Sequence, residues 1–126
     1  MKKTFLSILF VAFTLTISCS TEQVAVQSVE NMKTDELKSF DSALKSLTAP
    51  ENRSTPEETE RLGTQLNDRA LEVLFVAARK LMSSTNDKSI DLNATTRLDK
   101  EKIIVKATDS YFKQLNLIKA NQKSQN

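Results

Sequence analysis

The chain has 126 residues, with 18 Lys and Arg against 16 Asp and Glu, and it contains no His, one Cys and one Gly. This length is enough for one small domain and not for two. A single glycine argues against phosphate-binding and dinucleotide-binding loops, which need several, and disfavours a β-rich fold with tight hairpins.

The first eighteen residues have the layout of a secretory signal peptide. Lys2 and Lys3 make a positive start, and residues 5–17 form an uncharged apolar run. A helix needs about 20 apolar residues to cross the hydrocarbon core of a bilayer, so this run is too short for a permanent membrane span. We therefore expect residues 1–18 to be a signal peptide that is removed during export.

Cys19 is the only cysteine in the chain and stands where the apolar run ends. The segment Thr16-Ile17-Ser18-Cys19 resembles the lipobox of bacterial lipoprotein precursors, a four-residue pattern with an obligatory final cysteine. Ser18 matches the small residue required before that cysteine, whereas Thr16 departs from the usual Leu. The resemblance covers about the first twenty residues. It implies that a peptidase cuts before Cys19 and that lipid on the Cys19 sulfur holds the protein on a membrane.

Two other fates of the N-terminus compete with lipidation. Ordinary signal-peptide cleavage after Ser20 would release a secreted protein, and an uncleaved apolar segment would act as an anchor. Ser20 is the residue that follows the cysteine in this chain. Many Gram-negative lipoproteins that are retained in the inner membrane carry Asp at that position. The resemblance therefore implies an outer-membrane location in the cell envelope. Thr21-Glu22 is not the acidic run that signals surface export in some groups, so the periplasmic leaflet is favoured.

Removal of the signal changes the charge balance. Lys2 and Lys3 leave with it, so the chain from Cys19 onward has equal numbers of basic and acidic side chains. A neutral domain gives no support for nucleic-acid binding, because affinity for phosphate scales with the number of charges neutralised. No intramolecular disulfide can form, so the domain must be stabilised by apolar packing or by a partner.

The mature chain begins with a segment of no clear period, and we expect residues 19–30 to be a tether and residues 31–120 to be a helical domain. A first helix is expected from Val29 or Thr34 to Leu47. Its apolar residues recur at helical spacings of three and four and would share one face. They are Leu37, Phe40, Leu44 and Leu47.

The segment Thr55-Pro56-Glu57-Glu58 fits a capping box with proline at the first helical position. We expect one continuous helix from this box to Met82 or Ser83, with Gly63 in its second turn, where it would permit a close helix crossing. The apolar surface widens over residues 70–82, which is typical of a helix at the centre of a bundle.

Residues 90–98 are compatible with a helical turn, a loop packed on the core or an early start of the last helix. Asp99 is the expected N-cap of a helix from Lys100 to about Ala120. Residues 121–126 are expected to be a polar tail. The expected apolar face of the last helix contains Ile104, Thr108, Phe112 and Leu115, broadened by Val105 and Leu117.

No pattern in the mature chain predicts catalysis or a cofactor. Glu57, Glu58 and Glu60 cluster in a first helical turn, where capping accounts for them, and Asp87 and Asp91 lack the spacing of a calcium loop. Without His or a free thiol, zinc, copper and iron–sulfur sites are not expected.

The sequence thus predicts an all-α, three-helix domain on a lipid tether at Cys19. The favoured function is a non-enzymatic interaction or adaptor module, with the membrane and a protein of the cell envelope as partners. The alternative is a carrier of a small apolar ligand, with a cavity lined by Val73, Phe75 and Phe112. Core packing is the default expectation for the aromatic side chains Phe40, Phe75, Tyr111 and Phe112, and a partner-binding groove is the functional alternative.

Overall fold

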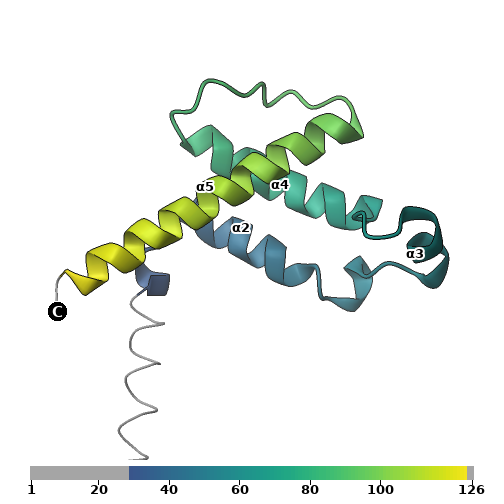
Figure 1. Cartoon of the computed structure of the whole chain (residues 1–126), viewed down its shortest axis with the longest axis horizontal. Helices are drawn as coiled ribbons and strands as arrows, with labels where there is room; N and C mark the ends of the chain where they lie inside the picture. The colour runs from purple at the N-terminus through teal and green to yellow at the C-terminus, as the bar shows by residue number, and fades with distance from the viewer. Residues whose placement is uncertain (1–28, 125–126) are drawn as a thin grey trace, which may run out of the picture. The chain divides into compact units, whose positions relative to one another are not determined.

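A computed structural model describes residues 29–124, and this part of the chain is helical and contains no strand (Figure 1). The all-α fold class is therefore confirmed. One compact unit begins at Lys33. Its elements are α2 (Asp35–Ser46), the 3₁₀ turn η1 (Pro50–Asn52), α3 (Pro56–Leu62), α4 (Asp68–Ser84) and α5 (Arg97–Lys123).

Helix α2 follows the predicted pattern closely. The Thr34 hydroxyl caps its start by accepting a hydrogen bond from the backbone N–H of Leu37. Leu37 and Phe40 are fully buried, and Leu44 and Leu47 pack against the same core. The helix ends before Pro50, which begins η1.

The expected long second helix is two helices instead. The capping box at Thr55 is present with both of its hydrogen bonds, but α3 ends after seven residues at Leu62. Gly63 ends it with a φ of +60°, and α4 begins after a new N-cap at Asn67. The expected close helix crossing at Gly63 is also wrong, because a Cβ built there meets nothing within 4 Å.

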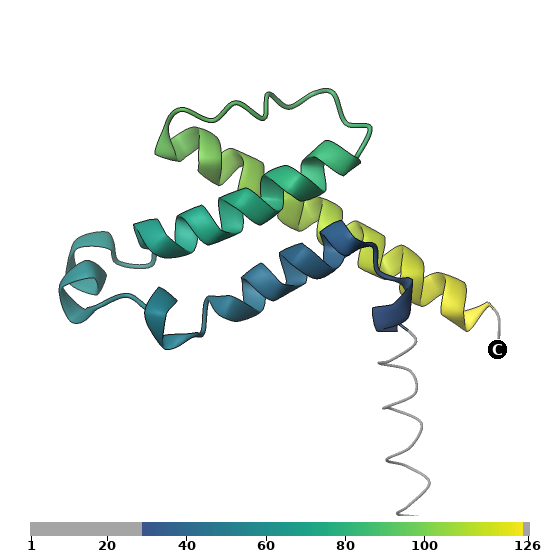
Figure 2. The same cartoon turned by 180° about the vertical axis from the view of Figure 1, so that it is seen from behind.

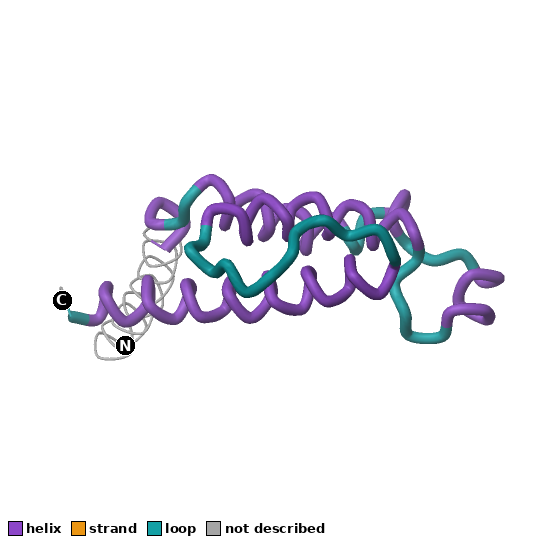
Figure 3. The backbone as a smooth tube through the Cα atoms, turned by 90° about the horizontal axis from the view of Figure 1, so that it is seen from above, coloured by secondary structure: helices purple, strands orange, loops and turns teal. Residues whose placement is uncertain are grey.

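Helices α4 and α5 run in the same sense and cross, as Figures 1 and 2 show. The chain must therefore return along α4 before α5 begins, and residues 85–96, here called the strap, make this return (Figure 3). Residues 90–95 of the strap alternate between core and solvent as in an extended segment. Ile90, Leu92 and Ala94 are partly buried against the core, while Asp91, Asn93 and Thr95 are exposed.

The last helix begins three residues earlier than expected and ends three residues later. Thr96 is its N-cap, and Asp99 is the third residue of a capping box with Thr96 rather than the cap itself. The helix continues to Lys123, into the segment expected to be a polar tail. Residues 90–96 are thus loop, which resolves the ambiguity of the segment 90–98.

The core lies where α2 and α5 pack against α4. Helix α4 contributes most of the buried side chains, as its wide apolar surface predicted. Phe40 of α2 and Tyr111 of α5 meet with ring centroids 5.5 Å apart. The inner face of α5 consists of Ile103, Ile104, Ala107 and Tyr111.

Candidate interaction surface

Cys19, the predicted lipidation site, lies outside the described residues. The tether over residues 19–30 likewise falls outside them except at its last two positions. Within the described part of the chain, no helix is both long and apolar enough to cross a bilayer.

The glutamates of α3 have structural partners. The Glu58 carboxylate accepts hydrogen bonds from the Arg69 guanidinium and from the Thr55 backbone N–H, and these bonds hold the pKa of Glu58 below its ordinary value. Arg69 also donates to the backbone carbonyls of Glu51 and Arg53. The cluster therefore fastens the segment before α4 to the start of that helix and leaves Glu58 ionised.

The two loop aspartates also make local turns. Asp87 accepts hydrogen bonds from the backbone N–H and the hydroxyl of Ser89, which lower its pKa, and Asp91 accepts one from the backbone N–H of Asn93. Each carboxylate is bound to the residue two positions later. Among the described residues, no group of three or more acidic, His or Cys side chains is placed to hold a metal ion.

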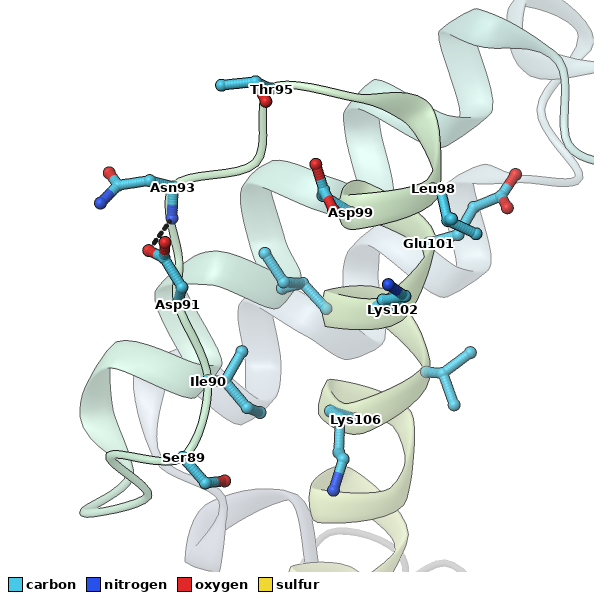
Figure 4. Close-up of a pocket in the computed structure, with 12 residues that line it drawn as sticks. Ser89, Ile90, Asp91, Asn93, Thr95, Leu98, Asp99, Glu101, Lys102 and Lys106 are labelled. Carbon is cyan, nitrogen blue, oxygen red and sulfur yellow. Dashed lines mark hydrogen bonds between the residues drawn. The ribbon is translucent and has the colours of Figure 1, made fainter.

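Two hollows lie beside the strap, and neither is lined by Val73 or Phe112. An open groove of about 840 Å³ separates the strap from the first half of α5 (Figure 4). Ile90 and Asp91 border it on the strap, and Leu98, Lys102 and Lys106 border it on α5. A second hollow of about 570 Å³ lies between α4 and the strap and includes Phe75.

The clearest surface feature is an exposed apolar row on the outside of α5. Leu98, Val105 and Phe112 keep 60%, 60% and 55% of their surface accessible. They are spaced seven residues apart, and seven residues turn an α-helix by about 20° less than two full turns. The three side chains therefore lie almost in line, and we call them the outer row.

This row corrects the expected face of α5. Phe112 and Val105 were expected on the apolar face that packs inward, yet both point to solvent, as does Leu117. Tyr111, one position before Phe112, takes the buried place. The two residues are about 100° apart on the helix, and with Tyr111 on the buried face Phe112 lies outside it.

Charged side chains border the outer row. Lys102, Lys106 and Lys113 lie along one side of it and are exposed. Two acidic residues lie next to the line of the row, with Asp109 about 20° from Leu98 and Glu101 about 20° from Phe112 on the opposite side. Glu101 pairs with Arg97 of the same helix at 3.0 Å. Within the described part of the chain, neither Lys102 nor Asp109 forms a salt bridge.

Apolar residues every seven positions supply one of the two apolar positions of a coiled-coil heptad. The other position is polar on this face, because Glu101 or Lys102 follows Leu98 and Thr108 or Asp109 follows Val105. The sequence carried this signal in the spacing of residues 98, 105 and 112. It is hidden because the buried residues of α5 lie between them and give the helix apolar residues on two faces.

Comparison of the chain with protein-family models, with curated proteins and with solved structures gives no match.

Proposed function

We propose that the protein is a lipoprotein of the cell envelope, anchored by lipid at Cys19, and that its helical domain is a non-enzymatic module that binds another protein. The observation that carries the binding proposal is the outer row of α5. Three large apolar side chains, each more than half exposed, lie in line on one helix.

Exposure in this pattern has a free-energy cost that binding would remove. Covering a Leu, Val or Phe side chain is worth about 1.5–3 kcal/mol relative to leaving it in water. Single exposed apolar residues are normal on protein surfaces, whereas three in line on one helix can be covered together by one partner. A row at seven-residue spacing suits a partner helix, whose own side chains would pack between Leu98, Val105 and Phe112.

The anchor proposal rests on the sequence around Cys19. It places the domain in the cell envelope, with the periplasmic leaflet of the outer membrane as the favoured location. Two or three acyl chains on one residue hold a protein stably on a membrane, where a single chain does not. The mass of the purified mature N-terminal peptide tests this proposal against ordinary secretion. Lipidation predicts a peptide that starts at Cys19 and carries acyl groups, whereas cleavage after Ser20 gives an unmodified peptide that starts at Thr21.

A carrier of a small apolar ligand is the weaker proposal. The side chains expected to line its cavity are separated, since Phe75 is buried against the core and Phe112 is exposed on the outside of α5. The groove beside the strap is bordered by charged residues such as Asp91, Lys102 and Lys106 as well as by apolar ones.

The binding proposal is tested by affinity capture from membranes with the tagged, full-length protein, produced alongside an untagged copy. Phe112→Ser and Leu98→Ser are compared with Val76→Ser, a matched control because Val76 is 66% exposed and lies on α4, a different helix from the row. We expect the wild type and the control to capture the same partner and the two row variants to lose it. The captured partner counts equally if it is the untagged copy of this chain. Equal capture by all four proteins, or capture by none, would contradict a binding role for the row.

A further inference from the structure

We propose that the partner of the outer row is the same row on a second copy of this chain, with the two α5 helices antiparallel and centred on Val105. This inference rests on the proposed function, because it names the partner of the surface described there. It follows from the order of apolar and charged residues along α5.

The apolar residues are arranged symmetrically about Val105. Leu98 precedes it by seven residues and Phe112 follows it by seven. A two-fold axis through Val105 therefore places the two Val105 side chains against each other and sets Leu98 of each copy against Phe112 of the other. A symmetric dimer requires this kind of self-complementary surface, because the same patch serves both subunits.

The charges next to the row fit the same register. Lys102 lies three residues before Val105 and Asp109 lies four after it. In the antiparallel pair, Lys102 of each copy falls within one residue of Asp109 of the other, so two symmetric ion pairs close over the apolar contact. Both side chains are without a salt bridge in the described part of the single chain.

A parallel pairing fits less well. It would place Asp109 beside Thr108 of the other copy, with no cation at that level. Asp109 and Glu101 both lie close to the line of the row, so an interface would cover them, and a covered carboxylate without a cation is costly. Glu101 keeps a cation in either pairing, because it pairs with Arg97 of its own chain at 3.0 Å, whereas Asp109 gains one only from the other copy. The position of Asp109 thus favours the antiparallel arrangement.

A short seam of three apolar residues from each copy is sufficient if the copies are concentrated. Lipid at Cys19 would hold both chains on one membrane, which raises their effective concentration without any new contact. The dimer is accordingly expected on the membrane and expected to weaken when the protein is diluted in detergent.

Disulfide trapping in membranes tests the register, using the full-length protein. The wild type, whose only cysteine is Cys19, is the background control. Val105→Cys lies on the proposed axis, so oxidation should link it to itself and give a band of twice the mass. Val76→Cys should not link. Leu98→Cys and Phe112→Cys should each fail alone and should link to each other when two differently tagged copies are produced together.

Charge reversal tests the ion pairs in the Val105→Cys background. Lys102→Glu or Asp109→Lys alone should lower the dimer band several-fold, and the two together should restore it. Restoration cannot result from damage to the fold, because the double variant carries both changes. A double variant as weak as the singles would overturn the ion pairs and the register that places them.

Other occupants of the row give different results. A photoreactive phenylalanine analogue at Val105 captures whatever lies there. An adduct that contains only this chain supports the dimer, whereas an adduct with another protein overturns the dimer and leaves the proposed function standing. No adduct of either kind overturns both. Self-linking of Leu98→Cys and Phe112→Cys would show a parallel pair and overturn the antiparallel one.

Discussion

The Tyr111 hydroxyl of α5 donates a hydrogen bond of 2.6 Å to the Asp41 carboxylate of α2. Asp41 also forms ion pairs with Lys45 at 2.6 Å and with the buried Lys33 at 3.4 Å. The Asp41 side chain is only 14% exposed, so these contacts are partly shielded from water. The bond from Tyr111 joins α5 to α2 through two residues seventy positions apart in the sequence, and it holds the Tyr111 side chain on the inner side of α5.

Asp41 should make stability depend on pH. Burial opposes its ionisation, but hydrogen bonds from Lys45 and Tyr111 and the charge of Lys33 more than offset burial, so the pKa of Asp41 is lowered. A carboxylate with a lowered folded pKa stabilises the fold above its ordinary pKa of about 3.9 and loses that effect as pH falls through the folded pKa.

We therefore expect Asp41→Asn to lower the free energy of unfolding by about 1.5–3 kcal/mol at pH 7, the usual worth of hydrogen bonds to a charged group. The difference between the two proteins should shrink as pH falls below about 4. Urea unfolding followed by circular dichroism at several pH values measures it. A difference that stays constant down to about pH 3 would show that the charge of Asp41 is unimportant.

Substitution of Phe40 and of Phe112 should show the difference between a core residue and a residue of the outer row. Phe40 is 0% exposed and Phe112 is 55% exposed. Phe40→Ala should cost about 3–5 kcal/mol because it leaves a cavity, whereas Phe112→Ala should stay within about 0.5 kcal/mol in the monomer. Thermal unfolding at low protein concentration compares them. A large loss at Phe112 in the monomer would mean that its surface is covered within the chain.

Asn67 is buried and does more than cap α4. Its side-chain oxygen accepts from the Ala70 backbone N–H, while its amide donates to the Asn52 carbonyl at 2.8 Å and to the Ser54 hydroxyl at 3.2 Å. Asn67→Asp keeps the oxygen that caps α4 but loses the amide N–H donor. It also places a negative charge beside the backbone carbonyl of Asn52. We expect it to destabilise the fold by about 2 kcal/mol or more.

Thr34→Asp is the control for this change. Thr34 is the exposed N-cap of α2, and its hydroxyl oxygen accepts a hydrogen bond from the Leu37 backbone N–H. Asp stabilises an N-cap position at least as well as Thr does. The unfolding midpoint of Thr34→Asp in urea should therefore match that of the wild type or exceed it. If Asn67→Asp and Thr34→Asp were equally stable, the bonds from Asn67 to residues 52 and 54 would contribute nothing.

Gly63 ends α3 in a backbone conformation that side chains rarely adopt, with φ of 60° and ψ of −118°. Space around it is open, so a methyl group meets no neighbour and only the backbone is strained. Gly63→Ala should cost about 1–3 kcal/mol in urea unfolding. Lys80→Ala, an exposed change on α4, should stay within about 0.5 kcal/mol. A neutral Gly63→Ala would mean that the turn relaxes to an ordinary conformation.

The features that the sequence predicted correctly are local. The capping box at Thr55 and Glu58 needs only residues three apart, and both of its hydrogen bonds form. The α2 face with Leu37 and Phe40 follows from helical spacing and is buried. Such features are readable because neighbouring residues determine them.

The features that it missed depend on distant residues. Leu62 and Leu66 keep a helical spacing across the break between α3 and α4, which hides it. The break is fixed by Asn67, whose amide binds residues 13 and 15 positions earlier. The inward choice of Tyr111 over Phe112 likewise depends on Asp41, which spacing within α5 does not reveal. The outer row became visible only once that choice was known.

Attachment of lipid at Cys19 is the central claim, because the location of the protein and the confinement of two copies to one membrane both depend on it. The most direct measurement is metabolic labelling of bacteria that produce the full chain, using a fatty acid that carries a detectable alkyne. We expect the wild-type protein to be labelled and to sediment with membranes, and Cys19→Ala to lose the label and the mature band. Label that persists in Cys19→Ala, or a wild-type protein without label, would contradict the account.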